Sequence, residues 1–188
     1  MTPVRAKGVS FRGAMQQLER RGGRELLDRV LARVGGEAGE ALRHGAVVSG
    51  GWYPAAWYAA LLEAVEAEHP SDPDAIRSLT REAVTEDFRT IFRLLSWVVS
   101  PEAALRNAVK IMARYWEGGR VEVLEARDGH VHFLFADYHG FTPQIWSDVV
   151  GGIEAVLDLM KVTRERIEPR NVSGDGSRCE MIVCYRTT

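Results

Sequence analysis

Arg120-Val-Glu-Val-Leu-Glu-Ala126 and His130-Val-His-Phe-Leu-Phe135, joined by Arg127-Asp-Gly129, form the stretch that decides the fold. Apolar and polar residues alternate on both sides of a turn signal. This pattern predicts an antiparallel β-hairpin with one face turned to a core. A helix-periodic segment follows from Pro143 to Lys161. The pattern therefore sets a hairpin next to a helix rich in apolar residues.

Two more strand-like segments follow that helix, Val162 to Glu168 and Arg178 to Tyr185, with a Gly-rich loop between them. Residues 118–188 thus have the order strand, strand, helix, strand, strand (ββαββ). Residues 1–10 are a frayed arm or a short edge strand, and residues 11–117 read as helices. Their expected spans are 11–21, 24–34, 37–44, 54–68, from 74 to about 99, and 100–116. Strands segregated from helices predict an α+β fold. We expect one domain over 1–188, an N-terminal helical layer (11–117) packed on a C-terminal antiparallel sheet (118–188).

Local signals mark the ends of several helices. Gly22-Gly23 and Gly35-Gly36 are helix breakers, while Ser100 and Pro101 are typical of a helix N-cap and first turn. Gly151 and Gly152 lie inside the helix expected over 143–161, where each glycine costs about 1 kcal/mol relative to alanine. We expect close approach of another element to compensate for this cost, with a hinge as the alternative.

The bulk composition excludes some classes of function. The 188-residue chain has a formal net charge of -2, which argues against a nucleic-acid-binding protein with a basic stripe. No signal peptide and no run of roughly 20 apolar residues is visible, so we expect a cytoplasmic protein without a membrane span. Cys179 and Cys184 are five residues apart on one expected strand and point to opposite faces, which argues against a disulfide between them.

Aromatic residues gather where the expected elements meet. Such residues either line a pocket for an apolar ligand or fill the core. The candidate ligand-binding residues are Trp57, Tyr58, Trp97, Tyr115, Trp116, Tyr138, His139 and Trp146.

Other candidates for chemistry are weaker. His139 follows a strand in a loop and could ligate a metal or haem iron, or act as a base. His130 and His132 share a strand face, but no cysteine lies near them to complete a zinc site. Asp148 and Glu154 are assigned to solvated helix faces. No catalytic motif is present, so we predict no catalytic residue, no metal and no cofactor.

Five segments carry a resemblance to a known family: Phe11-Arg-Gly13, Trp52-Tyr-Pro54, Arg120–Val123, Val149–Val156 and Cys179–Val183. In these segments the chain resembles an uncharacterised family of myxobacterial paralogues. By resemblance, that family is related to a ligand-binding superfamily shared by haem nitric-oxide-binding sensors, 4-vinyl reductase (V4R) domains and a transport-particle subunit. The resemblance implies helices over an antiparallel sheet with a cavity between them, and dimerisation in several members.

The chain departs from the haem-binding members of that superfamily. They carry Tyr-x-Ser-x-Arg before the helix that corresponds to Pro143–Lys161, where this chain has Ala136-Asp-Tyr-His-Gly-Phe141. They also carry a histidine on the preceding helix, and 103–116 contains none.

The expected function is a non-enzymatic sensor or protein-interaction module that binds a small apolar ligand between helices and sheet, or a partner protein. The alternatives are a haem or gas sensor with His139 as the iron ligand, or a small enzyme acting on a hydrophobic substrate. We also predict a homodimer, because the helical faces are richer in apolar residues than one sheet face can cover.

Overall fold

The structure is a computed structural model that describes residues 4–95 and 100–187. Side chains are described except at 89–95, 101, 102, 108 and 109. Within the second half of the helix expected from 74 to about 99, Phe88 is buried, and the side chains that follow it lie outside this description.

The alternating segments form a four-stranded antiparallel sheet. Its strands are β4 (Arg120–Arg127), β5 (His130–Ala136), β6 (Thr163–Arg170) and β7 (Cys179–Arg186), in the order β4-β5-β7-β6. Alternation along the two central strands gives the sheet one buried face, with Phe133 of β5 and Met181 of β7 fully buried. The predicted α+β class with an antiparallel sheet is therefore confirmed.

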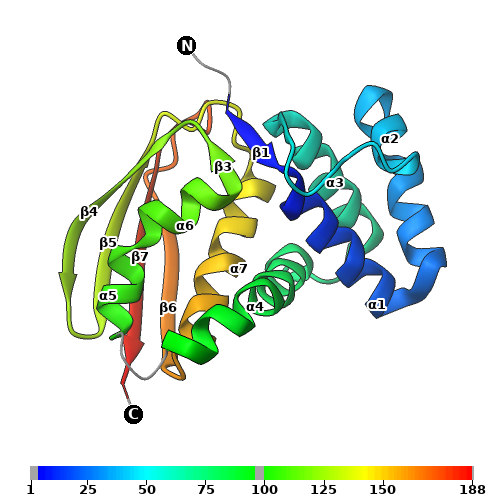
Figure 1. Ribbon diagram of the computed structural model, residues 1–188. Helices are drawn as coiled ribbons and strands as arrows, with labels where there is room; N and C mark the ends of the chain where they lie inside the picture. Colours follow the sequence, from blue (N-terminus) through cyan, green and yellow to red (C-terminus); the bar gives the residue numbers. More distant parts are fainter. Residues whose placement is uncertain (1–3, 96–99, 188) are drawn as a thin grey trace.

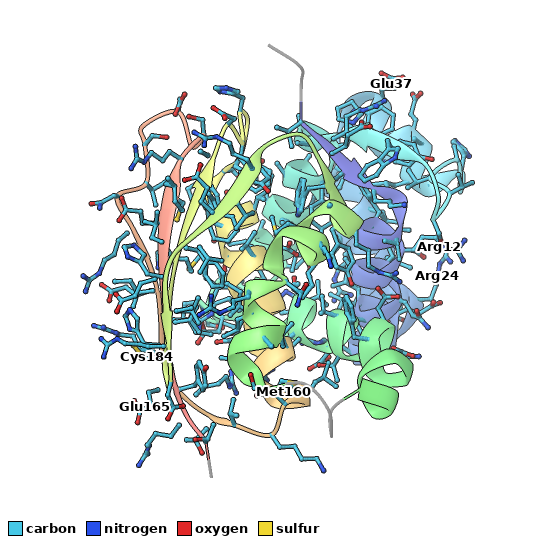
Figure 2. The ribbon with its side chains drawn as sticks, turned by 60° about the vertical axis from the view of Figure 1, so that its left-hand side comes forward. Arg12, Arg24, Glu37, Met160, Glu165 and Cys184 are labelled. Atoms are coloured by element: carbon cyan, nitrogen blue, oxygen red, sulfur yellow. The ribbon has the colours of Figure 1, made fainter. Side chains whose placement is uncertain are left out.

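The helices lie on the buried face of this sheet (Figure 1). They are α1 (Gly8–Arg33), α2 (Gly36–Arg43), α3 (Ala55–Glu68), α4 (Ala75–Leu95), α5 (Pro101–Arg106), α6 (Ala108–Tyr115) and α7 (Pro143–Leu159). Helix α7 lies directly against the sheet, and α4 crosses over α7 on the side away from the strands (Figure 1). Figure 2 shows that the sheet and α1 lie on opposite sides of the molecule, with Cys184 on the sheet and Arg12 and Arg24 on α1.

The predicted helix ends agree with the backbone. Gly22 and Gly23 have non-helical dihedral angles, so α1 is two helical segments that meet at a kink. The Ser100 side chain accepts a hydrogen bond from the Ala103 amide at 3.2 Å, which is the predicted N-cap of α5. The helix predicted over 100–116 is interrupted at Asn107, which separates α5 from α6.

A second, small sheet was not predicted. Its strands are β1 (Arg5–Lys7), β2 (Trp52–Pro54) and β3 (Trp116–Glu117), in the order β2-β1-β3. The N-terminal arm thus forms the central strand of this small sheet, and not the frayed arm or edge strand that we expected. Strands β2 and β3 lie within residues 11–117, where we expected helices alone. Segments of two or three residues are too short to show a period of two, so pattern reading cannot detect them.

The close approach expected at the two glycines of α7 is present at Gly151. A Cβ atom built on Gly151 would lie 2.5 Å from the backbone oxygen of Arg77 in α4. The same atom on Gly152 would meet nothing within 4 Å. Gly151 therefore allows α4 and α7 to pack in backbone contact, whereas Gly152 faces open space.

Candidate ligand cavity

A cavity of about 360 Å³ lies between the helices and the sheet. Most of its walls come from α1, α4, α6, α7 and β5, and α3, α5 and β3 contribute one residue each. The volume falls in the range of about 300–1,000 Å³ that is typical of small-molecule sites. The open space next to Gly152 belongs to this cavity.

The walls of the cavity are mainly aromatic and aliphatic. Phe133 and Phe135 point into the molecule from the sheet because they occupy alternate positions of β5. Tyr58 comes from α3, Tyr115 ends α6, and Trp116 begins β3. Aliphatic lining residues complete the surface: Val9, Val84, Leu105, Ile111, Met112, Val149, Ile153 and Val156.

A buried carboxylate belongs to this apolar surface. Asp148 of α7 is only 7% exposed, and its Oδ1 accepts hydrogen bonds from the Tyr58 hydroxyl at 2.9 Å and from Thr80 Oγ1 at 2.6 Å. Its other oxygen, Oδ2, accepts no hydrogen bond from any residue in 4–95 or 100–187. Burial is the largest effect on this group and raises the pKa of Asp148 to about 6, against the lowering by the two hydroxyl donors.

Two other carboxylates at the cavity have cationic partners. Asp87 accepts two hydrogen bonds of 3.1 Å from the guanidinium of Arg114 and one of 2.7 Å from the Tyr115 hydroxyl. Glu86 is paired with Arg20 and also accepts a hydrogen bond from Gln17 at 2.9 Å. Asp148 is different because its two partners are neutral hydroxyl groups.

Both tyrosines that bond to these carboxylates are held in the protonated form. Burial, the largest cause, raises the pKa of Tyr58 and of Tyr115, and the adjacent carboxylates raise it further. The two phenols therefore act as hydrogen-bond donors and not as anionic ligands.

Only some of the candidate ligand-binding residues predicted from the sequence line the cavity. Tyr58, Tyr115 and Trp116 line the cavity. Tyr138 and Trp146 do not line it. They are buried around Phe141, with ring centroids 4.7 and 4.9 Å from that of Phe141, and pack against the lining residue Phe135 at 6.1 and 5.6 Å.

The remaining candidates lie elsewhere. Trp57 is half-buried and stacks on Tyr53 with ring centroids 5.8 Å apart. His139 lies in the loop after β5, half-buried, with Nδ1 4.0 Å from Asp175. Trp97 is outside the described residues.

The assignment of Asp148 and Glu154 to solvated faces was wrong, because both are buried, Glu154 at 6% exposure. Glu154 pairs with Arg77 and Arg164, which compensates for its burial. The composition of α7 could have indicated the burial of Asp148. This residue lies between Trp146 and Val149 in a helix that is apolar on several sides, and such a helix has few solvent-exposed positions.

None of the five histidines of the chain lines the cavity. His130 and His132 lie on the outer face of β5, where His132 Nε2 is 3.1 Å from Glu180 Oε2 and His130 Nδ1 is 3.7 Å from Cys184 Sγ. His44 and His69 are in or next to loops of the helical layer. No cluster of three or more metal-binding side chains occurs within the described ranges.

The chain matches no protein-family model, and no curated protein is significantly similar to it. Solved structures do match. An Fe(II) unliganded H-NOX protein mutant from K. algicida aligns with a TM-score of 0.74 and 16% identity, covering 97% of each chain. An H-NOX protein from S. oneidensis gives a TM-score of 0.70 at 8% identity over 96% of each chain.

An oxygen-binding H-NOX domain related to soluble guanylate cyclases also aligns, with a TM-score of 0.66, 13% identity and coverage of 96% of this chain and 95% of that one. The alignments span both the helical layer and the sheet. This chain therefore has the fold of H-NOX domains.

Proposed function

We propose that this chain is a non-enzymatic sensor domain that binds a small, largely apolar ligand in the cavity between its helices and its sheet. The observation that carries the proposal is the cavity itself: about 360 Å³, with aromatic and aliphatic walls and a buried carboxylate at Asp148. Apolar walls with a few fixed polar groups are typical of ligand sites. The likeness to H-NOX structures, one of them described as oxygen-binding, supports a sensing role.

Haem is the second candidate, favoured by the likeness in fold to H-NOX proteins in Fe(II) states. The residues of the cavity do not fit haem. No histidine lines it, and the lining tyrosines are held as protonated donors to Asp148 and Asp87. His139, the iron ligand suggested by the sequence, lies outside the lining, beside Asp175.

Adding haemin to the purified protein separates these candidates. A site without an axial ligand gives no shift of the Soret band and no stoichiometric end point. A saturable Soret shift at one haemin per chain, lost in His139→Ala, would instead establish the haem sensor and overturn the proposal.

The enzyme hypothesis has one observation in its favour, since a carboxylate with a raised pKa in a cavity is also what a general acid or base requires. Among the described residues, the hydrogen-bond partners of Asp148 are Tyr58 and Thr80, both of which donate to it. No histidine, lysine or second carboxylate among those residues pairs with Asp148 to form an acid–base couple, so we keep the enzyme as the weaker hypothesis.

Binding of a neutral, polarity-sensitive naphthalene dye, prodan, tests the proposal directly. The protein should increase the fluorescence of the dye in a saturable manner. Gly152→Leu places a side chain in the cavity from a position with open space around it, and should abolish this binding. Ala67→Leu makes the same kind of change at an exposed position of α3 and should leave binding unchanged. Equal binding by Gly152→Leu and the wild type would contradict the proposal.

Pairing of the chain with a partner protein, and its assembly as a homodimer, are part of the same proposal. The structure offers an outer sheet face on which the helices do not lie (Figure 1).

Within the described ranges, no helix has both the length and the apolar character required to cross a membrane.

A further inference from the structure

The unused oxygen of Asp148 is an unusual feature of the cavity. More than nine-tenths of this residue is buried, yet Oδ2 has no partner among the described residues. Among the described residues, the one fully buried side-chain nitrogen or oxygen without a hydrogen-bond partner is Arg77 Nε, so the unpaired Oδ2 of Asp148 keeps access to the cavity. A carboxylate oxygen that is unpaired and accessible at a cavity wall can receive a donor from a bound molecule.

The charge of Asp148 points in the same direction. Glu86 and Asp87, the other carboxylates at the cavity, are neutralised by Arg20 and Arg114. The cationic side chain on the lining itself, Arg12, lies on an exposed position of α1 and makes no ion pair with Asp148. No described residue supplies Asp148 with a counter-charge, so a bound molecule would have to provide it.

The aromatic walls suit a cation as well as an apolar body. Tyr58, Tyr115, Trp116, Phe133 and Phe135 all line the same cavity. The faces of aromatic rings attract ammonium groups, and aromatic cages are a recurring means of binding them. An anionic ligand would meet Asp148 without a compensating cation beside it.

We propose that the cavity binds a small hydrophobic amine in its protonated form, with the ammonium group donating to Oδ2 of Asp148 and the apolar body lying among the aromatic side chains. This inference rests on the proposed function, because it requires the cavity to be a ligand site. It adds the chemical class of the ligand.

Three probes of similar size and different charge test it: 2-phenylethylammonium, 2-phenylethanol and 3-phenylpropanoate. Each is titrated against the prodan complex of the full chain at pH 7.5. The ammonium probe should displace the dye at least about tenfold more effectively than the alcohol, as expected for a hydrogen bond to a charged group. The carboxylate probe should be the weakest.

Asp148→Asn keeps the shape of the side chain and an acceptor for Tyr58 and Thr80, but removes the charge. It should reduce the preference for the ammonium probe over the alcohol to less than about threefold, while prodan still binds. Asp158→Asn makes the same change on the same helix, at an exposed residue that pairs with Arg164, and should keep the full preference.

The outcomes separate the two proposals. If the alcohol competes as well as the ammonium probe, if the carboxylate probe is the strongest, or if Asp148→Asn keeps the preference, the amine inference is wrong while the cavity remains a ligand site. The same holds if prodan binds and the ammonium probe fails to displace it. If prodan itself does not bind to the wild type, the proposed function fails first, and the inference fails with it.

Discussion

The neighbouring glycines of α7 allow a paired test of the packing between α4 and α7. Gly151→Ala and Gly152→Ala add the same methyl group one residue apart in the same helix. Each gains about 1 kcal/mol from the higher helix propensity of alanine. The gain is common to both variants, so the difference between them reports the surroundings of the new methyl group.

Those surroundings differ strongly. At Gly151 the new Cβ would lie 2.5 Å from the Arg77 oxygen and 3.1 Å from the Arg77 carbonyl and Cα carbons, which are backbone atoms that cannot rotate away. Separating the two helices should cost about 1–3 kcal/mol, the usual range for overpacking. At Gly152 no heavy atom lies within 4 Å, so no such cost applies.

We therefore expect Gly152→Ala to stabilise the protein by up to about 1 kcal/mol, and Gly151→Ala to be less stable than Gly152→Ala by about 1–3 kcal/mol. Urea unfolding followed by far-ultraviolet circular dichroism measures both values, and thermal unfolding should separate the two variants by at least about 2 °C. Equal stabilisation by both alanines would refute the close approach of α4 to α7 on which the shape of the cavity depends.

Three further predictions concern single groups and assembly. Between about pH 4 and pH 6 the folded protein holds a proton on Asp148 that the unfolded chain has released, so raising the pH through this window lowers the stability of the folded state. Because the pKa is about 6 in the folded protein in place of 3.8, the wild type should lose on the order of 3 kcal/mol of stability relative to Asp148→Asn across this window. Urea unfolding at several pH values measures this, and parallel pH profiles of the two proteins would contradict it. Cys179 is buried, and burial raises the pKa of its thiol to about 11. A thiol reagent should therefore modify the half-buried Cys184 alone in the native protein, and both cysteines in denaturant. Labelling of the native Cys184→Ser variant would contradict the burial of Cys179. The predicted homodimer should appear in light scattering at micromolar concentration, and a monomer mass there would reject it.

Much of the fold could be predicted because each element carries its own periodic signal. The alternation in 120–135 and 178–185 defined three strands of the sheet to within a residue or two, and the fourth was expected over the mostly polar segment 162–168, where β6 lies at 163–170. Helix breaks at Gly22-Gly23 and the cap at Ser100 followed from local backbone chemistry. The order β4-β5-β7-β6 was not readable, because several pairings of two hairpins satisfy the same alternation.

The candidate site was predicted only in part. Three of the eight candidate aromatic and histidine residues, Tyr58, Tyr115 and Trp116, line the cavity, while Tyr138 and Trp146 are core residues packed against the lining residue Phe135. The described candidates lie near the ends of elements, and residue type alone does not distinguish a cavity wall from a core. The distinction depends on gaps left between packed helices, which no single segment encodes.

The sequence by itself determined the class of the fold, the places where helices begin and break, and which faces of the strands are apolar. Only the tertiary structure decided that Asp148 is buried with one oxygen unpaired, that Gly151 and not Gly152 carries the helix contact, and that the N-terminal arm pairs with two short strands, β2 and β3. The physical reason is that periodicity reports which side of an element avoids water. It does not report which other element covers that side, or how closely, and a ligand cavity is formed by those distances.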